Sequence, residues 1–245
     1  SDLVVIDYPA ALALRQMSMV HDELPKYLLA PEVSALLHYV PDLRRKMLLA
    51  TLWNTGARIN EALALTRGDF SLAPPYPFVQ LATLKQRTEK AARTAGRTPA
   101  GQQTHRLVPL SDSWYVSQLQ TMVATLKIPL ERRNKRTGRT EKARIWEVTD
   151  RTVRTWIGEA VAAAATDGVT FSVPVTPHTF RHSYAMHMLY AGIPLKVLQS
   201  LMGHKSISST EVYTKVFALD VAARHRVQFS MPESDAVTML KNRHA

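Results

Sequence analysis

Apolar residues recur every three or four positions along most of this 245-residue chain, and this spacing predicts helices. The first clear helix begins at Ala30, where Pro31 suits a first helical turn. Gly192 and Gly203 stand where helix ends are expected. Further helices are predicted over residues 41–55, 59–65, 112–126, 149–165, 177–190, 194–201, 208–216 and 218–229, with a short amphipathic segment over 235–242.

Three short stretches have the alternating pattern of strands, over residues 70–72, 78–84 and 105–110. The polar segment 86–104 is too long for a tight turn, so it is either a flexible loop or a segment that orders on a partner. Residues 1–28 contain Pro9 and Pro25, which argue against a continuous helix there. The expected fold class is therefore α+β, mainly α-helical, with one small three-stranded antiparallel sheet.

The chain is strongly basic, with 31 Lys and Arg against 20 Asp and Glu and a net charge of +11. Such an excess favours a polyanionic partner such as DNA, although it also fits an ordinary basic protein. Two segments, 86–104 and 132–144, concentrate the positive charge, and such runs are also typical of solvated surface. The candidate DNA contacts in them are Arg87, Lys90, Arg93, Arg133, Lys135 and Arg136.

The chain has no cysteine, which excludes disulfides, a thiol nucleophile and cysteine-based metal sites. No apolar run is long enough to span a bilayer, and the start of the chain has no secretory signal pattern. We therefore expect a cytoplasmic protein with no membrane partner. The chain does not begin with Met, which suggests a processed or engineered start.

Residues 177–183, PHTFRHS, place His178 and Arg181 one turn apart near the positive end of a predicted helix. The Arg fork could hold a phosphate there, with the imidazole as a proton-transfer group. An isolated pair at this spacing is more often just polar surface. His178 and His182 are four residues apart and could also meet a zinc ion, but the sequence lacks the Glu of a metalloprotease motif, so we expect no metal.

Two more sequence motifs accompany this one. Residues 55–63, TGARINEAL, place an Arg just after a Gly turn, and residues 201–204, LMGH, precede a Tyr by nine positions. Read in order, the set resembles the tyrosine recombinase, or phage-integrase-like, family over about residues 28 to 217. The residues that carry the resemblance are Arg58, His178, Arg181, His204 and Tyr213.

The resemblance implies a catalytic domain that cuts and rejoins DNA through a 3′-phosphotyrosine formed at Tyr213. Arg58 and Arg181 would hold the non-bridging oxygens of the scissile phosphate. His178 would transfer a proton, and His204 would hydrogen-bond the phosphate near the leaving oxygen.

The resemblance also implies roles for Glu61 and for a lysine. Glu61 matches an acidic position that supports the site. The family's general acid is a Lys in the hairpin between the second and third strands, which Lys85 fits best and Lys90 fits as the alternative. An ammonium there would protonate the leaving oxygen. The phosphotyrosine conserves the bond energy, so no cofactor is expected.

The partners implied are double-stranded DNA with specific sites, a homotetramer on that DNA, and possible accessory proteins. The event would be integration, excision, inversion or dimer resolution, in a bacterial, plasmid- or phage-associated setting. Residues 1–28 would be an extension or linker remnant, 29–230 the catalytic domain, and 231–245 a tail. Relatives carry a further N-terminal DNA-clamping domain, so truncation is favoured. The tail would dock on a neighbouring subunit through Val237, Met239 and Leu240, or else it is frayed.

Two other functions fit part of the pattern. A type IB topoisomerase-like enzyme shares the phosphotyrosine chemistry, but the LMGH motif at residues 201–204 and the HTFRHS motif at residues 178–183 resemble recombinases more closely. A DNA-binding protein that has lost catalysis is the other, and the intact set of matching positions argues against it. The sequence does not define the target site.

Overall fold

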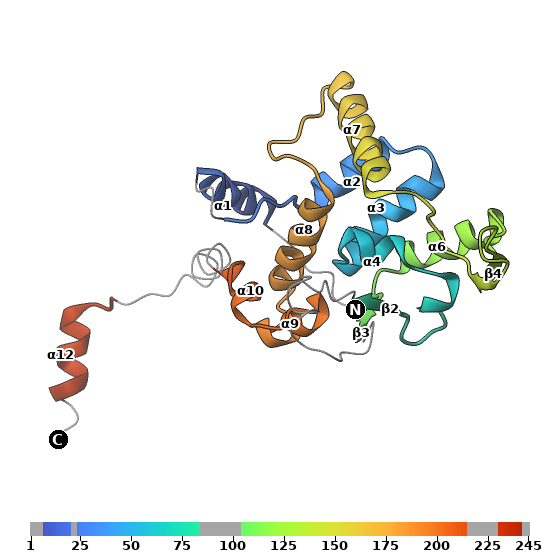
Figure 1. Cartoon of the computed structure of the whole chain (residues 1–245). Helices are drawn as coiled ribbons and strands as arrows, with labels where there is room; N and C mark the ends of the chain where they lie inside the picture. The colour runs from blue at the N-terminus through green and yellow to red at the C-terminus, as the bar shows by residue number, and fades with distance from the viewer. Residues whose placement is uncertain (1–6, 21–23, 84–103, 215–229, 242–245) are drawn as a thin grey trace, which may run out of the picture.

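The computed structural model describes residues 7–20, 24–83, 104–214 and 230–241. Helices dominate them, as predicted, and a small sheet lies at one edge, beside α4 and α9 (Figure 1). The described helices are α1 (Tyr8–Val20), α2 (Ala30–His38), α3 (Leu43–Thr55), α4 (Ile59–Leu63), α6 (Ser113–Thr125), α7 (Asp150–Thr166), α8 (Pro177–Tyr190), α9 (Leu195–Met202), α10 (Ser208–Glu211) and α12 (Glu233–Lys241), with a 3₁₀ turn, η1, over Arg67–Asp69.

The predicted sheet is present, with three antiparallel strands in the order β1 (Phe70–Ser71), β2 (Phe78–Thr83) and β3 (Thr104–Pro109). Strands β2 and β3 pair along their whole length, from Phe78 opposite Pro109 to Thr83 opposite Thr104. The predicted α+β class, mainly helical with a small three-stranded sheet, is therefore confirmed. The segment that joins β2 to β3 lies outside the described residues.

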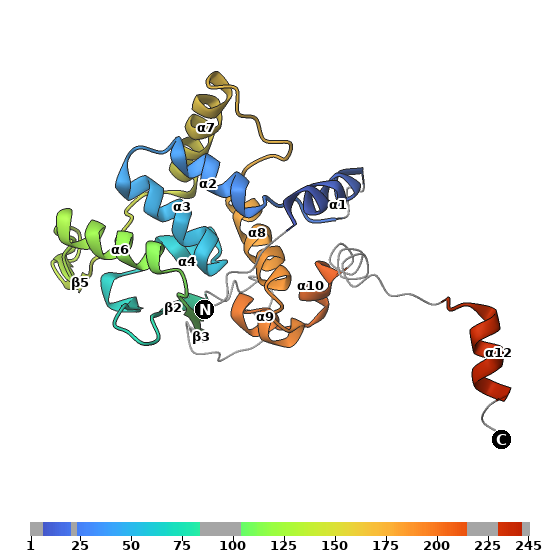
Figure 2. The ribbon, with the colours of Figure 1, turned by 180° about the vertical axis from the view of Figure 1, so that it is seen from behind.

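Helix α3 is the centre of the core and packs against α8 and α6 (Figures 1 and 2). Every residue from Met47 to Leu52 is buried, so this helix is enclosed on all sides. Large apolar side chains close the core around it, including Trp146, Tyr115 and Phe180. This burial fixes α8 against α3, and the ends of both helices carry the candidate site.

The ends of the helices follow the sequence signals. Thr176 caps α8, accepting from the backbone N–H of Thr179 at 3.4 Å, and Pro177 occupies the first helical position. Gly203 ends α9 in the left-handed conformation, with φ of 69°. These ends confirm the predicted start of α8 and the predicted stop of α9. The predicted helix over 218–229 lies outside the described residues.

Residues 1–28 contain a helix that the sequence analysis did not identify, α1, which begins beside Pro9 and ends before Pro25, over Tyr8–Val20. Pro9 lies in the first turn, where its missing N–H breaks no hydrogen bond. Ala11 joins the core, and the buried Arg15 pairs with Glu32 of α2. The predicted boundaries at residues 28 and 230 remain predictions.

The basic segment between α6 and α7 forms a two-stranded hairpin that the sequence analysis did not predict. Strands β4 (Glu131–Arg133) and β5 (Thr140–Lys142) pair with Arg132 opposite Glu141. The pattern was missed because these strands contain no apolar residue, so hydrophobic alternation is absent. Arg132 pairs with both Glu141 and Glu147, whereas the candidate DNA contacts Arg133, Lys135 and Arg136 are exposed.

Helix α12 lies apart from the other described elements in both views (Figures 1 and 2). It has no buried residue, and Val237, Met239 and Leu240 are 51%, 64% and 62% exposed. These three side chains therefore have the exposure that the docking hypothesis requires. No helix in the described part of the chain has the length and apolar character needed to cross a membrane.

We predict that Gly56→Ala lowers the free energy of unfolding by about 2–4 kcal/mol in urea titrations. Gly56 has φ of 65°, and an added Cβ would lie 2.4 Å from Cδ1 of Tyr184. The matched control is Gly138→Ala, since Gly138 has φ of 67° but its Cβ would meet only Arg133, at 3.9 Å. The control should lose only about 1–2 kcal/mol, the cost of the backbone conformation. Equal losses would contradict the close approach at Tyr184.

Candidate active site

Arg58 stands between two helices, two residues after the Gly that ends α3 and immediately before α4. Its backbone N–H donates to Oε1 of Glu61 at 2.8 Å, which fixes the start of α4. Its side chain is 42% exposed and makes only a loose ion pair, 3.7 Å from Nη1 to Oε2 of Glu61. The backbone of Arg58 is thus fixed, while its guanidinium is exposed and can bind a ligand.

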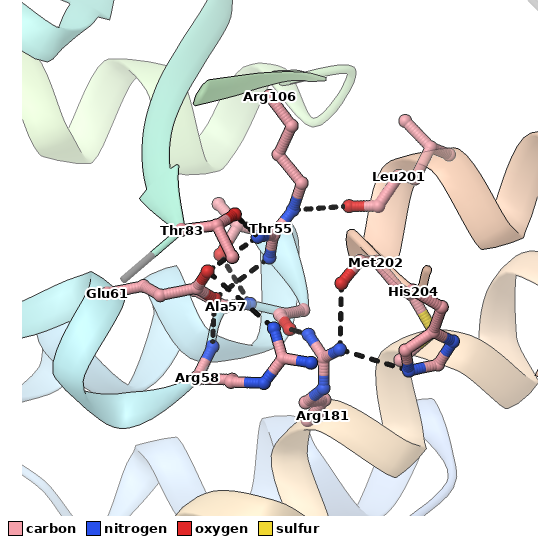
Figure 3. Close-up of polar contacts among 11 residues, drawn as sticks. Thr55, Ala57, Arg58, Glu61, Thr83, Arg106, Arg181, Leu201, Met202 and His204 are labelled. Atoms are coloured by element: carbon pink, nitrogen blue, oxygen red, sulfur yellow. Dashed lines mark hydrogen bonds and ion pairs between the residues drawn. The ribbon is translucent and has the colours of Figure 1, made fainter. Parts of the chain in front are cut away.

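Arg181 lies in the first half of α8 and is almost fully buried. Its Nη1 donates to the carbonyl of Gly56 at 2.6 Å, and its Nη2 donates to the carbonyl of Met202 at 2.8 Å. Nη2 also lies 3.2 Å from Nε2 of His204 (Figure 3). Burial, with the nearby Arg58 and Arg106, lowers the pKa of Arg181 to about 10, so it is still a cation at neutral pH.

His204 follows the turn at Gly203 and is held at both ring nitrogens. Burial and the charge of Arg181 lower its pKa to about 4, so the ring is neutral at pH 7. A guanidinium can only donate, so Nε2 is the acceptor from Arg181. The ring proton is then on Nδ1, which donates to Oγ1 of Thr210 at 2.8 Å. This arrangement fixes the tautomer of His204.

Arg106 is a site residue that the sequence analysis missed. It makes a bidentate pair with Glu61, with Nη1 at 2.5 Å from Oε2 and Nη2 at 2.9 Å from Oε1 (Figure 3). Its Nε donates to the carbonyl of Leu201 at 2.8 Å, and its Nη1 donates to Oγ1 of Thr83 at 3.0 Å. One buried guanidinium therefore connects α4, the end of β2 and the last turn of α9.

The predicted supporting role of Glu61 has a clear geometry in this arrangement. Glu61 is 3% exposed, and the hydrogen bonds and charge of Arg106, with Arg58, outweigh burial and lower its pKa. A carboxylate held in this way stays ionised at neutral pH. Glu61 accordingly provides a fixed negative charge under Arg58 while Arg106 takes up most of its hydrogen-bonding capacity.

Gly203 lets Arg106 lie close to the turn before His204. An added Cβ on Gly203 would lie 2.9 Å from Nη1 of Arg106 and 3.1 Å from its Cδ. The predicted helix stop therefore has a second role, because a larger residue would push the guanidinium away from this turn.

A signal for Arg106 was present in the strand pattern. Val108 and Leu110 are buried, and Arg106 lies two residues before Val108, on the same side of the extended chain. An arginine at an inward position of a strand needs a buried partner. The sequence alone could not name that partner, which lies 45 positions away.

A cleft of about 680 Å³ lies beside the Glu61–Arg106 pair. Arg58, Arg181 and His204 contribute to its wall, and the exposed His178 joins them from the start of α8. The structure therefore brings four of the predicted catalytic residues together. Its other charged or hydroxyl-bearing wall residues are Glu61, Thr83, Asp150, Arg154, Lys205, Ser206 and Ser209.

The fifth predicted residue, Tyr213, does not line this cleft. Its side chain is 2% exposed, and its hydroxyl lies 2.8 Å from Nδ1 of His182. Burial raises the pKa of Tyr213 to about 12, against the opposing effect of Arg181 and Arg58. Burial and the neighbouring His178 and Arg181 lower the pKa of His182 to about 4. Both partners are therefore neutral at pH 7.

Several predicted residues cannot be placed. Lys85, Lys90, Arg87 and Arg93 lie outside the described residues, so the choice of general acid stays a prediction. Thr83, the last residue of β2, does line the cleft, which brings the strand that leads to Lys85 to the edge of the site.

The two histidines weighed as zinc ligands are neighbours along α8. The rings of His178 and His182 stack with centroids 6.1 Å apart. Within the described ranges, no group of three or more His, Cys, Asp or Glu side chains is arranged to hold a metal ion.

The family model described as the phage integrase family matches residues 26–219. This chain belongs to the phage integrase family. The match covers the whole described site, including Arg58, Arg181, His204 and Tyr213, and it confirms the tyrosine recombinase resemblance seen over about residues 28 to 217.

Relatives within this family have informative names. The chain is 98% identical over 242 residues to a protein named Resolvase from Escherichia coli, covering 99% of this chain and 93% of that protein. It is 48% identical over 236 residues to a probable site-specific recombinase in the afa region of Escherichia coli, covering 96% and 89%. It is also 33% identical to tyrosine recombinase XerD of Mycobacterium leprae, covering 86% of this chain and 63% of that protein.

Solved structures of tyrosine recombinases share the fold. The crystal structure of XerA recombinase superposes with a TM-score of 0.59 at 20% identity, covering 84% of this chain and 67% of that chain. The Tn1549 transposon integrase in complex with a circular intermediate DNA gives a TM-score of 0.59 at 20% identity, covering 91% and 67%. The fold of this phage integrase family member is thus that of a recombinase catalytic domain.

We predict that Arg106→Met lowers the free energy of unfolding by about 3–5 kcal/mol, because it leaves the buried Glu61 carboxylate without its main partner. Urea titration measures the loss. Adding Glu61→Gln to this variant should recover part of it, since the amide carries no buried charge.

The control is Arg45→Met, which removes a surface pair with Glu159 whose side chains are 41% and 61% exposed. That change should cost only about 1 kcal/mol or less. A similar loss for Arg106 and Arg45 would show that the Glu61 pair does not hold the site together.

We also predict that stability falls as the pH is lowered from about 6.5 towards 4. In this window an unfolded histidine, with an ordinary pKa near 6.5, binds a proton that the native His182 and His204 do not bind, so acid favours the unfolded chain. Urea titrations at several pH values measure the slope. His182→Asn removes one of these groups and should make the slope shallower, and an unchanged slope would contradict the buried neutral state of His182.

Proposed function

We propose that this protein recombines DNA at specific sites by cutting and rejoining strands through a 3′-phosphotyrosine at Tyr213. Site-specific recombination agrees with its family and with the name Resolvase of a 98% identical relative. Among the events considered, dimer resolution is favoured by that name. The target sequence is a separate question that base-reading side chains would decide.

One observation supports this chemistry most strongly, the buried charge of Arg181. Among the described residues its hydrogen-bond partners are two carbonyls and a neutral imidazole, and none of these three supplies a negative charge. The nearby Glu61 is engaged by Arg106. A buried cation usually needs an opposite charge, and here it opens onto a cleft together with Arg58. A DNA phosphate would supply that charge.

The cleft has what a phosphoryl transfer site needs. Two guanidiniums would stabilise the extra negative charge that the phosphate develops during displacement. His178 is exposed at the start of α8 and lines the cleft, and we propose that it exchanges a proton with the reacting group. We propose Lys85 as the acid that protonates the leaving 5′-oxygen, since it follows the strand whose last residue, Thr83, lines the cleft.

His204 would change its hydrogen bonds when a phosphate binds. In the present state its Nε2 accepts from Arg181, so it has no proton to offer to an oxygen of the substrate. A phosphate bound by Arg181 would replace that acceptor. The ring could then donate from Nε2 and accept from the hydroxyl of Thr210, which is 2.8 Å from Nδ1.

Tyr213 would attack the phosphorus and form the covalent intermediate, which the free 5′-hydroxyl later reverses. A phenol with a pKa of about 12 is a weak nucleophile, so it must lose its proton near the cations of the cleft as it attacks. We propose that no metal or other cofactor takes part. We propose further that the protein acts as a tetramer on two DNA sites, with accessory proteins possible, and that α12 docks on a neighbouring subunit.

The test is a nicked suicide duplex carrying the cognate site, which selection from random duplexes would identify. With the wild-type protein, a labelled protein–DNA band should form on a denaturing gel and should be absent for Tyr213→Phe. Arg58→Ala should slow formation of the band by about 10²–10³-fold, because one of the two groups that stabilise the developing charge is lost.

The matched control is Tyr76→Phe, since Tyr76 is 84% exposed and lies away from the cleft. This variant should form the band at the wild-type rate. Cleavage without a covalent band, or a band that persists in Tyr213→Phe, would rule out the proposed chemistry. Relaxation of supercoiled DNA that carries no recombination site would instead indicate a topoisomerase.

A further inference from the structure

His182 has a contact that the proposed chemistry does not use. It follows Arg181 on α8, and consecutive residues of a helix point about 100° apart. Arg181 therefore reaches Gly56, Met202 and His204, whereas His182 reaches the hydroxyl of Tyr213 at 2.8 Å. The rings of His182 and Tyr213 lie 5.7 Å apart, tilted by 57°. The hydroxyl of Tyr213 is thus bound at His182 and not at Arg181, although Arg181 and Arg58 are close enough to act on its pKa.

We infer that His182 is a positioning residue that holds Tyr213 in a protected resting position outside the phosphate cleft, and that this hydrogen bond must break before Tyr213 can attack. The inference rests on the proposed role of Tyr213 as the nucleophile. Attack requires the phenol oxygen to be about 3–3.5 Å from the phosphorus. Tyr213 does not line the cleft where Arg58 and Arg181 would hold that phosphate.

In this state His182 does not act as a base towards the hydroxyl of Tyr213. The pKa of Tyr213 is about 12 and that of His182 is about 4, so the phenol keeps its proton. In either tautomer of the neutral imidazole the hydroxyl remains protonated. The bond therefore holds an unreactive phenol in place.

The surroundings of His182 allow this bond to be tested by substitution. His182 is partly buried and borders a second pocket of about 440 Å³, whose wall includes Pro25, Pro174 and Val212. His178 lines both this pocket and the cleft, so it stands at the boundary between them. A replacement at His182 has space on one side and does not have to fit a fully packed core.

The experiment is nitration of the DNA-free protein with tetranitromethane, which attacks accessible phenols, followed by mass spectrometry of each tyrosine. Two variants separate the hydrogen bond from packing. His182→Phe keeps an aromatic ring and removes the ring nitrogen, whereas His182→Asn keeps a hydrogen-bonding atom close to the position of Nδ1.

Two tyrosines of the same chain serve as internal references. Tyr76 is 84% exposed and reports full reactivity. Tyr115 is fully buried, with its hydroxyl 2.6 Å from Oγ1 of Thr51, and reports full protection. The measured quantity is the nitration rate of Tyr213 divided by that of Tyr76, and continued protection of Tyr115 shows that the fold has not opened generally.

In the wild-type protein Tyr213 should be protected far more than Tyr76. In His182→Phe the ratio should rise by about two- to tenfold, the range expected when one hydrogen bond that holds the closed state is removed. In His182→Asn the ratio should return towards the wild-type value. A ratio that does not change in His182→Phe would overturn the inference, because packing alone would then protect Tyr213.

Free reactivity of Tyr213 in the wild-type protein would overturn it as well. The nitration experiment uses no DNA and no catalysis, so its result is independent of the covalent-band assay. If no covalent protein–DNA band forms but the nitration ratio changes in His182→Phe, the result counts against the proposed function. If the band forms normally but the ratio does not change, the result counts only against the role of His182.

Discussion

The candidate site depends on one buried ion pair, between Glu61 on α4 and Arg106 on β3. The same guanidinium binds the carbonyl of Leu201 at the end of α9, three residues before His204. Glu61 in turn accepts from the backbone of Arg58. Separating any of these segments would leave a buried charge without its partner, which costs several kcal/mol. This constraint keeps residues from three distant parts of the chain in register around the cleft.

The arrangement also concentrates positive charge, and this has an energetic cost. Burial lowers the pKa of Arg181, and the like charges of Arg58 and Arg106 lower it further. Glu61 and the carbonyls at Gly56 and Met202 offset only part of this repulsion. Strained electrostatics of this kind are typical of sites that receive a ligand of opposite charge. A bound phosphate would relieve the repulsion. The clustered positive charge that lowers the stability of the free protein would therefore raise its affinity for DNA.

Arg58 and Arg181 line the cleft in the free protein, whereas the proposed nucleophile, Tyr213, does not line it. Arg181 contacts His204, and its neighbour His182 holds the hydroxyl of Tyr213. Activity would then depend on movement of the segment after α10 relative to α8. If Tyr213 is the nucleophile, as proposed, such a division would keep it protected until DNA is bound, and a duplex would not be cut without a partner strand.

The sequence by itself determined the local features of this protein. Periodicity predicted the helices, Gly192 and Gly203 predicted helix ends, and the ordered motifs indicated the family, because each depends on residues close together in the chain or on a known spacing. Only the tertiary structure decided that Arg106 meets Glu61 and that Tyr213 lies outside the cleft. It also revealed α1 and the β4–β5 hairpin. The proline in the first turn of α1 reads as a helix breaker, and the strands of the hairpin have no apolar residues to alternate. Contacts between buried groups far apart in sequence are set by packing, on which local periodicity carries no information.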